Sequence, residues 1–170
     1  MIKVIETKLK GVLQISPPTI FKDFRGEYVE TYNNDLYIEN GIDIEFIQDD
    51  ISVSKKNVLR GIHGDSKTWK LVTCLYGSFH LIVVNNNINS PQYKLFQSFI
   101  LSDKNRYQIL IPPYFGNGHL VLSDFAIFHY KQSTNYDRLG QFTIMWDDPT
   151  YNFDWPVNNP ILSKRDQGIE

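Results

Sequence analysis

The stretch Phe79–Val84, with the sequence FHLIVV, decides the fold class of this chain. Alternate residues of a β-strand face opposite sides, and both alternate sets of this stretch are largely apolar. Both faces of the strand are therefore expected to be at least half buried. The turn-rich segment Asn85–Pro91 follows directly and ends the strand.

The same pattern extends outward over Phe46–Trp146, where short apolar, β-branched and aromatic runs alternate with turn-forming residues. Lys94–Leu101 and Tyr107–Ile111 have the strand signature. Val121–Leu122 and Ala126–Lys131 are separated by a short polar turn and read as a hairpin. Many short strands at this spacing predict an all-β sandwich or barrel.

The N-terminal part of the chain differs from this strand-rich middle. Asn34–Asn40 predicts one short helix, capped by Asn33 or Asn34 and stopped at Gly41. Residues 1–32 read as strands that lack a core of their own. Their apolar side chains need another surface to cover them, and a second copy of the chain is an economical source. We therefore expect a homodimer.

Composition narrows the class of protein further. A length of 170 residues fits a single domain over residues 1–170, and 42% hydrophobic residues can supply its core. The formal charge of −2 gives no reason to expect nucleic acid as a partner. Cys74 lies in an apolar run and reads as a buried structural thiol. Residues 1–10 lack the apolar core of a signal peptide and no membrane span is expected, so the sequence predicts a cytoplasmic protein.

The densest group of chemically useful residues is Val58–His63, with the sequence VLRGIH. Arg60 is a permanent cation, His63 titrates near neutral pH, and Gly61 permits unusual backbone geometry. Arg60 and His63 can enter one site only if Gly61 breaks the alternation of the strand. The alternative is a surface arginine and a histidine with an ordinary structural hydrogen bond. Arg25 also precedes a glycine, and together with Arg60 it would suit a diphosphate; a surface arginine at a turn is again the alternative.

Two other chemistries find little support in the sequence. Metal-binding β-barrels usually carry two histidines one residue apart on a strand, so that both face the ion. The four histidines of this chain are scattered singly, so no metal is expected. The sequence contains neither the Gly-x-Ser-x-Gly turn of serine hydrolases nor the phosphate-binding loop of nucleoside triphosphatases.

A series of short motifs runs through most of the chain in a fixed order. They are F-x-D-x-R-G-x-x-x-E at Phe21–Glu30, then Gln48–Ser54, Leu59–His63, Lys70–Val72, Ser90–Pro91, Ile111–Ser123, Tyr130–Lys131, Trp146–Pro149, Trp155–Pro156 and Leu162–Asp166. No single motif is diagnostic, but the ordered set is specific. In this order the chain resembles the dTDP-4-dehydrorhamnose 3,5-epimerase family, cupins that act on nucleotide-linked 4-keto sugars.

The resemblance implies a cupin jelly-roll β-barrel with a short helical segment and N-terminal strands exchanged between two protomers. Inverting a carbon requires a proton to leave one face and another to arrive on the opposite face, next to a carbonyl that acidifies it. By resemblance, His63 is the base, oriented by Asp166, and Tyr130 is the acid across the sugar ring. Lys70 would stabilise the enolate, and no metal or organic cofactor is needed. The residues that the resemblance assigns to the nucleotide diphosphate sugar are Arg25, Glu30, Gln48, Arg60 and Tyr136.

Two departures from the family pattern bear on the substrate. The family motif Gly-Phe-x-His-Gly-Phe is Tyr-Phe-Gly-Asn-Gly-His at residues 114–119, so Asn117 replaces a histidine expected near the C4 oxygen. Either Lys70 holds the enolate with Asn117 as a neutral donor, or His119 reaches in through a local distortion at Gly118. Asp50 stands where asparagine is common, which would favour an additional hydroxyl or amino donor on a different nucleotide or a larger sugar.

The function that these features favour is epimerisation at C3, or at C3 and C5, of a nucleotide-linked 4-keto-6-deoxy sugar used in a surface polysaccharide. The sequence leaves open dTDP or GDP as the nucleotide and hexose or heptose as the sugar. The alternatives are a 3,4-ketoisomerase of related fold, which would move the carbonyl, and a non-catalytic sugar-binding cupin. Incorporation of solvent deuterium with retention of the 4-keto group would separate epimerase from ketoisomerase.

Overall fold

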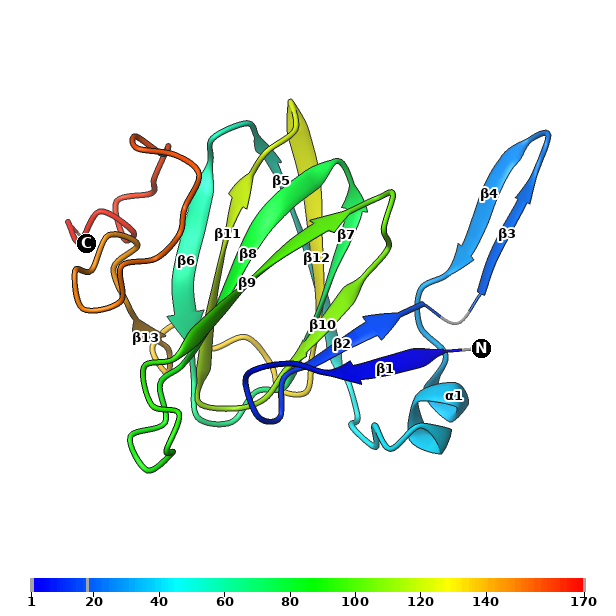
Figure 1. Cartoon of the computed structure of the whole chain (residues 1–170), viewed down its shortest axis with the longest axis horizontal. Helices are drawn as coiled ribbons and strands as arrows, with labels where there is room; N and C mark the ends of the chain where they lie inside the picture. The colour runs from blue at the N-terminus through cyan, green and yellow to red at the C-terminus, as the bar shows by residue number, and fades with distance from the viewer. Residues whose placement is uncertain (1, 18, 170) are drawn as a thin grey trace.

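Two antiparallel sheets face each other and form the body of the molecule, with a separate hairpin projecting from it (Figure 1). The structure is a computed structural model that describes residues 2–17 and 19–169. Met1, Pro18 and Glu170, which belong to the predicted domain 1–170, lie outside the described residues. The layered, almost entirely β arrangement is a jelly roll, as the sequence predicted.

The first sheet has six strands in the order β1-β2-β10-β7-β12-β5. β5 ends this sheet on one side and pairs only with β12 among the described strands. The bounds are β1 (Lys3–Glu6), β2 (Leu13–Ser16), β10 (Gln108–Ile111), β7 (Lys70–Tyr76), β12 (Phe125–Gln132) and β5 (Gln48–Lys55).

The second sheet has five strands in the order β13-β6-β11-β8-β9. The orange and red C-terminal segment lies beside β6 in Figure 1. The bounds are β13 (Phe142–Thr143), β6 (Leu59–Gly64), β11 (Phe115–Val121), β8 (Ser78–Asn85) and β9 (Phe96–Ser102). The sequence predicted a hairpin across the short turn between β11 and β12, and this prediction was wrong: the two strands pair with different neighbours and belong to different sheets.

β8 shows why the sequence folds in two layers. Phe79, Leu81 and Val83 pack in the core between the sheets, while Ile82 and Val84 pack in a second cluster on the opposite face. All five side chains are fully buried, so the prediction of two covered faces is confirmed. The second cluster is covered by aromatic side chains of the C-terminal segment, which explains why burial is more complete than half.

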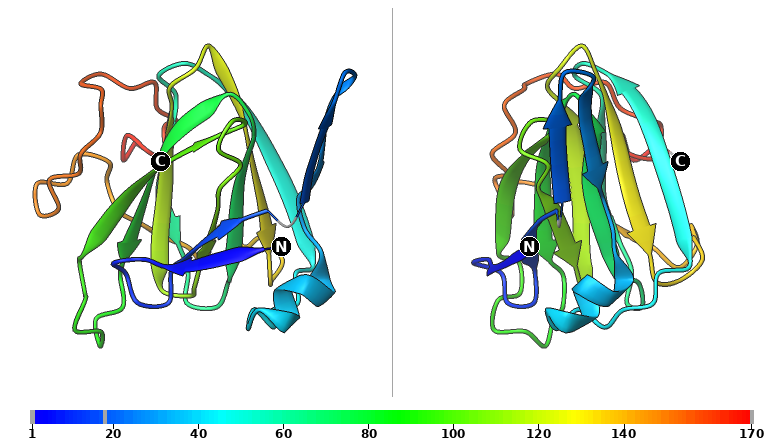
Figure 2. Two further views of the ribbon diagram at one scale, coloured as in Figure 1. Left: turned by 45° about the vertical axis from the view of Figure 1, so that its right-hand side comes forward. Right: turned by 90° about the vertical axis from the view of Figure 1, so that its right-hand side faces the viewer.

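The N-terminal part forms strands and one helix, as predicted, but its first two strands do have a core within this chain: β1 and β2 join the first sheet, and Ile15 is fully buried. β3 (Thr19–Asp23) and β4 (Gly26–Glu30) make a two-stranded sheet of their own that extends away from the barrel (Figures 1 and 2). α1 (Asn34–Glu39) begins at the cap Asn33, whose side chain accepts a hydrogen bond from the backbone N–H of Leu36 at 3.3 Å. Gly41 follows the helix with a φ of +83°, in the left-handed region that favours glycine.

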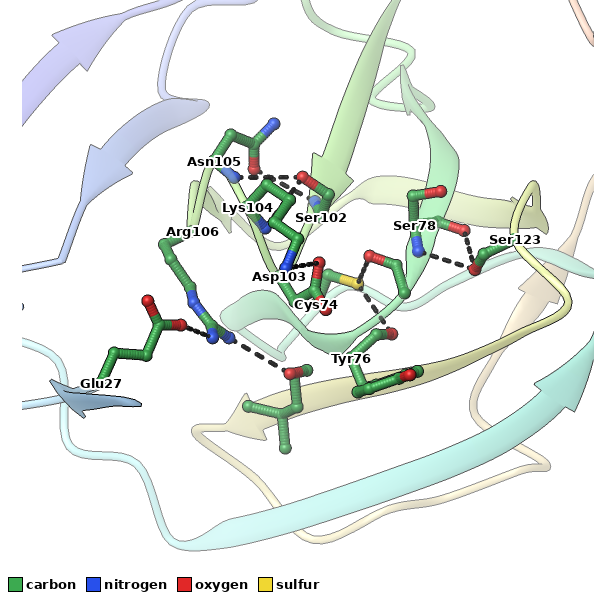
Figure 3. A network of polar contacts seen from close by, with 12 residues as sticks. Glu27, Cys74, Tyr76, Ser78, Ser102, Asp103, Lys104, Asn105, Arg106 and Ser123 are labelled. Atoms are coloured by element: carbon green, nitrogen blue, oxygen red, sulfur yellow. Dashed lines mark hydrogen bonds and ion pairs between the residues drawn. The ribbon is translucent and has the colours of Figure 1, made fainter. Parts of the chain in front are cut away.

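A polar network links β4, close to the tip of the hairpin, to the first sheet (Figure 3). The guanidinium of Arg106 donates to the carboxylate of Glu27 on β4 and, at 3.2 Å, to the carbonyl of Leu75. Cys74 is buried nearby, and its thiol contacts the carbonyl oxygens of Tyr76 at 3.3 Å and Gly77 at 3.4 Å. Burial raises the pKa of the Cys74 thiol to about 12, so it stays protonated and structural.

Candidate active site

A cavity of about 210 Å³ lies inside the barrel, lined by both sheets. Most of its lining side chains are polar or ionisable, although the surrounding core is apolar. The lining residues are Ser52, Arg60, His63, Lys70, Asn117, His119, Phe128, Tyr130, Tyr136 and Gln141. Burying polar side chains away from water costs free energy unless they are paired or have a function. The polar lining therefore makes this cavity the candidate active site.

Gly61 brings Arg60 and His63 into the same cavity. The pairing of β6 with β11 shifts register at this point, between His63 opposite Asn117 and Arg60 opposite His119. Gly61 has a φ of +115°, and a Cβ there would lie 2.6 Å from the Cα of Gly118. Only glycine fits this position, and the predicted break in alternation is confirmed.

His63 forms a pair with a carboxylate from the C-terminal segment. Its Nε2 lies 2.7 Å from Oδ1 of Asp166, which is 3% exposed, and Ser163 donates to Oδ2 of the same carboxylate at 2.9 Å. Burial raises the pKa of Asp166, but the hydrogen bond and charge of His63 and the hydrogen bond from Ser163 lower it below its usual range. The anionic carboxylate can accept a hydrogen bond from Nε2–H, and in that tautomer of the imidazole Nδ1 is free to accept a proton.

Tyr130 enters the cavity from the other sheet, on β12. It lies directly across from Asp50 on β5, in regular antiparallel register. Gln48 and Gln132 both donate to Oδ2 of Asp50, at 2.7 and 2.8 Å, which holds this carboxylate in place. Burial, followed by the negative charge of Asp50, raises the pKa of Tyr130 to about 12. The phenol therefore remains protonated at neutral pH.

Lys70 and Asn117 meet between these two walls. Lys70 begins β7, and its Nζ donates to Oδ1 of Asn117 at 3.3 Å. The lysine is 5% exposed, and burial lowers its pKa to about 8 against the opposing charge of Asp65. The ammonium is thus charged at pH 7 and directed into the cavity, where an anionic oxygen would gain from it.

His119 also lines the cavity, together with Lys70 and Asn117. The predicted distortion at Gly118 was wrong. β11 pairs with β8 in unbroken register from Phe115 to Val121, so His119 faces the cavity by ordinary alternation, two residues beyond Asn117. The local irregularity lies at Gly61 of the neighbouring strand instead.

Not every predicted substrate residue lies at this cavity. Arg25 is at the exposed tip of the hairpin and pairs with Asp23 at 2.5 Å. Glu30 ends β4 and does not line the cavity within this chain. Gln48 and Asp50 lie behind Tyr130 and Tyr136, where Gln48 accepts a hydrogen bond from the backbone N–H of Tyr136 at 2.8 Å.

The sequence patterns did not identify three residues that line the cavity: Ser52, Phe128 and Gln141. Ser52 lies two residues after Asp50 and Phe128 two residues before Tyr130, so strand alternation could have found both. Gln141 lies outside the strands, and nothing in the sequence pointed to it.

Within residues 2–17 and 19–169, no three histidine, cysteine or acidic side chains are grouped so as to hold a metal ion. The same part of the chain contains no helix long and apolar enough to cross a membrane.

Comparisons with known proteins agree with this geometry. The family model of dTDP-4-dehydrorhamnose 3,5-epimerase matches residues 6–170. The dTDP-4-dehydrorhamnose 3,5-epimerase of Shigella flexneri is 38% identical over 167 residues, covering 96% of this chain and 92% of its own length.

Solved structures give the same result. A dTDP-6-deoxy-D-glucose-3,5-epimerase from Legionella pneumophila, in complex with dTDP-4-keto-L-rhamnose, superimposes with a TM-score of 0.93 at 35% identity, covering 99% of this chain and 91% of that chain. A 4-keto-6-deoxy sugar epimerase from the novobiocin gene cluster of Streptomyces spheroides gives a TM-score of 0.92 at 30% identity, covering 98% and 85%.

The cavity that His63 and Tyr130 line from separate sheets of one jelly roll, together with these relatives, indicates an isomerase of the sugar epimerase class. Within that class, the chain belongs to the dTDP-4-dehydrorhamnose 3,5-epimerase family.

Proposed function

We propose that this cavity epimerises C3, or C3 and C5, of a nucleotide-linked 4-keto-6-deoxy sugar, a hexose or a heptose. His63 removes the proton from the carbon next to the C4 carbonyl, and the electron pair moves to the C4 oxygen as an enolate. Tyr130 then gives its phenolic proton to the opposite face of the same carbon, and the carbonyl reforms. The tyrosinate regains a proton and the imidazolium releases one, so substrate and product differ only in configuration.

The observation that carries this proposal is that His63 and Tyr130 line one cavity from two different sheets. A planar enolate held between them would offer one face to each group. Asp166 favours the imidazolium that forms when His63 takes the proton. We therefore assign the role of base to His63 and the role of acid to Tyr130.

Lys70 and Asn117 are the groups that we assign to the C4 oxygen. Their side chains meet at 3.3 Å inside the cavity, and the ammonium can follow the oxygen as its negative charge grows. Arg60 lines the same cavity, with its Nε donating to Ser54 at 3.0 Å, which leaves its terminal nitrogens for a phosphate of the nucleotide. Tyr136 at the rim is assigned to the nucleotide or sugar.

The test is incubation of the protein in D2O with a panel of 4-keto nucleotide sugars on dTDP and GDP, followed by mass spectrometry and NMR. We expect deuterium at C3, or at C3 and C5, of a product that retains its 4-keto group. A product with the carbonyl moved to C3 would replace the proposal with ketoisomerisation. Binding of the nucleotide sugars without any exchange would leave a sugar-binding protein.

We further propose that two copies exchange their β3–β4 hairpins, which brings Arg25 and Glu30 to the cavity of the partner. β5 is an edge strand with an open side, and its outward side chains Ile51 and Val53 are exposed. The hairpin has no third strand and exposes Phe21 and other apolar side chains. Pairing the hairpin of one copy with the β5 edge of the other would cover both surfaces.

Mixed dimers test this exchange. Arg25→Ala and His63→Asn are each expected to lose most activity when measured alone. After mixing and exchange of subunits, a hybrid contains one cavity with an intact His63 and an intact Arg25 from the other copy, so about a quarter of the wild-type activity should return. A monomer by light scattering, or no recovery in hybrids shown to have formed, would contradict the exchange.

The setting of the reaction is part of the proposal. The reduced, buried Cys74 suits the reducing conditions of the cytoplasm. Sugars of this type serve as donors for surface polysaccharides such as capsule or lipopolysaccharide, and this is the use we propose for the product.

A further inference from the structure

Two rows of side chains face the interior of the barrel, one beyond the other. The first row is Asp50, Asn117 and Tyr130, around the reacting groups described above. The second row lies two residues further along each of the same strands, β5, β11 and β12. We call it the floor of the cavity, and its members are Ser52, His119 and Phe128.

The floor contains two buried polar atoms that have no hydrogen-bond partner among the described residues. These atoms are Oγ of Ser52 and Nε2 of His119. His119 is 4% exposed, and both side chains line the cavity. Buried polar groups in folded proteins are almost always paired, so an unpaired couple in a binding cavity points to a group that arrives with the ligand.

The imidazole of His119 is held rigidly for such a role. Its ring stacks on Phe128 with centroids 4.1 Å apart and an angle of 9° between the planes, and it also contacts Phe79 at 5.2 Å. Burial and the positive charge of Arg60 lower the pKa of His119 to about 3, so the ring is neutral. A neutral imidazole can donate with one nitrogen and accept with the other, which suits a hydroxyl group.

The position of the floor indicates which part of the sugar it would meet. If the C4 oxygen lies at Lys70 and Asn117, as in the proposed function, the carbon side chain on C5 adjoins it. His119 is the next residue of β11 on the same face, about 7 Å along the strand from Asn117. The family motif has phenylalanine at this place, which can contact a methyl group but cannot form such a hydrogen bond.

We infer that the floor is a specificity site for a hydroxyl on the C5 side chain of the sugar, bound by Ser52 and His119. The inference rests on the proposed function, because it takes the C4 oxygen to lie at Lys70 and Asn117. Among 4-keto-6-deoxy sugars, a hexose ends in a bare methyl group at this point, whereas a heptose carries a hydroxyl on one further carbon. The substrate class is therefore a 4-keto-6-deoxy sugar with a hydroxylated side chain.

Matched pairs of unreactive analogues test the inference by calorimetry. The pairs are dTDP-6-deoxy-gluco-heptose with dTDP-6,7-dideoxy-gluco-heptose, and GDP-6-deoxy-manno-heptose with GDP-6,7-dideoxy-manno-heptose, and the members of each pair differ only by the hydroxyl on the second side-chain carbon. In the series of the correct nucleotide, the wild type should bind the hydroxylated member about tenfold more tightly, the effect of one good hydrogen bond. His119→Phe should abolish this preference, and Ser52→Ala should reduce it.

The control is His63→Asn, which keeps the floor and should keep the wild-type preference between analogues. Equal binding of both members by the wild type, or an unchanged preference in both floor variants, would overturn the inference and leave the proposed function standing. Failure to bind any of the four analogues, dTDP or GDP would instead overturn the proposed function. If His119→Phe does not fold, Ser52→Ala alone decides between these outcomes.

Discussion

The two walls of the cavity both pair an acid–base side chain with an aspartate, and they use it in opposite ways. On the wall of β6, Asp166 accepts a hydrogen bond from Nε2–H of His63, and its own pKa lies below the usual range. On the wall of β12, Asp50 faces Tyr130 and helps to raise the pKa of the phenol to about 12. One aspartate prepares its partner to accept a proton, and the other keeps a proton on its partner.

The difference follows from the charge that each partner acquires. An imidazole becomes positive when it works as a base, so a neighbouring carboxylate stabilises the working form. A phenol becomes negative when it works as an acid, so a neighbouring carboxylate opposes the loss of its proton. The Tyr130 wall therefore releases its proton only to a strongly basic carbon, which is what an enolate intermediate presents.

Replacement of His63 is expected to have the largest effect. His63→Asn should lower exchange of the C3 proton with solvent deuterium by about 10⁴-fold, because the other described residue of β6 that lines the cavity, Arg60, is not a base. The affinity for the nucleotide should stay nearly unchanged, as measured by calorimetry with dTDP and GDP. Exchange at the wild-type rate in this variant would remove His63 from the role of base.

Replacement of Tyr130 should separate the two steps of the reaction, removal of the proton and its return to the opposite face. Tyr130→Phe is expected to slow formation of the epimerised product by about 10²-fold or more, while proton removal on the His63 wall continues. NMR in D2O should then show deuterium in recovered substrate before product accumulates. Equal losses of exchange and of product would mean that the two walls do not act in separate steps.

Replacement of Asp166 should have a smaller effect, because Asp166 acts through His63. Asp166→Asn is expected to reduce deuterium exchange by about 10- to 100-fold, the usual range for a residue that orients another. The variant also loses the negative charge next to His63, so the loss should fall on the rate of exchange, while calorimetry with dTDP and GDP should give nearly the wild-type affinity for the nucleotide.

The control for this variant is Ser163→Ala, which removes the hydrogen bond to Oδ2 but leaves the carboxylate charge. It should exchange deuterium at close to the wild-type rate. Equal losses of exchange in both variants would indicate a purely structural role for Asp166.

The ease of predicting each wall from the sequence also differed. The resemblance to the family led to His63 and Tyr130, and strand alternation showed that Gly61 must break the pattern for Arg60 and His63 to share one site. Alternation is a local property of the chain, so a sequence carries it directly. The pairing of Asp166 with His63 spans 103 positions and came only from the resemblance, because contacts of that range depend on the whole fold.

The floor and the hairpin mark the limits of such prediction. Whether the nitrogens and oxygens of His119 and Ser52 find partners depends on the packing of several strands, which no local pattern reports. The place of Arg25 depends on a surface outside the hairpin that carries it. The sequence indicated that the N-terminal strands need a covering surface, but not which side chains would meet.

Replacement of Asp50 should have the smallest effect and should act only on the Tyr130 wall. Asp50→Asn keeps the shape and can still accept from Gln48, but it removes the charge that opposes ionisation of the phenol. The pKa of Tyr130 should fall from about 12 toward its ordinary value, as followed by tyrosinate absorbance against the Asp50→Asn, Tyr130→Phe double variant. A more acidic phenol returns its proton to the enolate faster, so product should form a few-fold faster relative to deuterium exchange. An unchanged titration of Tyr130 would show that burial alone sets its pKa. Asp50 would then have no effect on its partner, and the comparison between the two aspartates would fail.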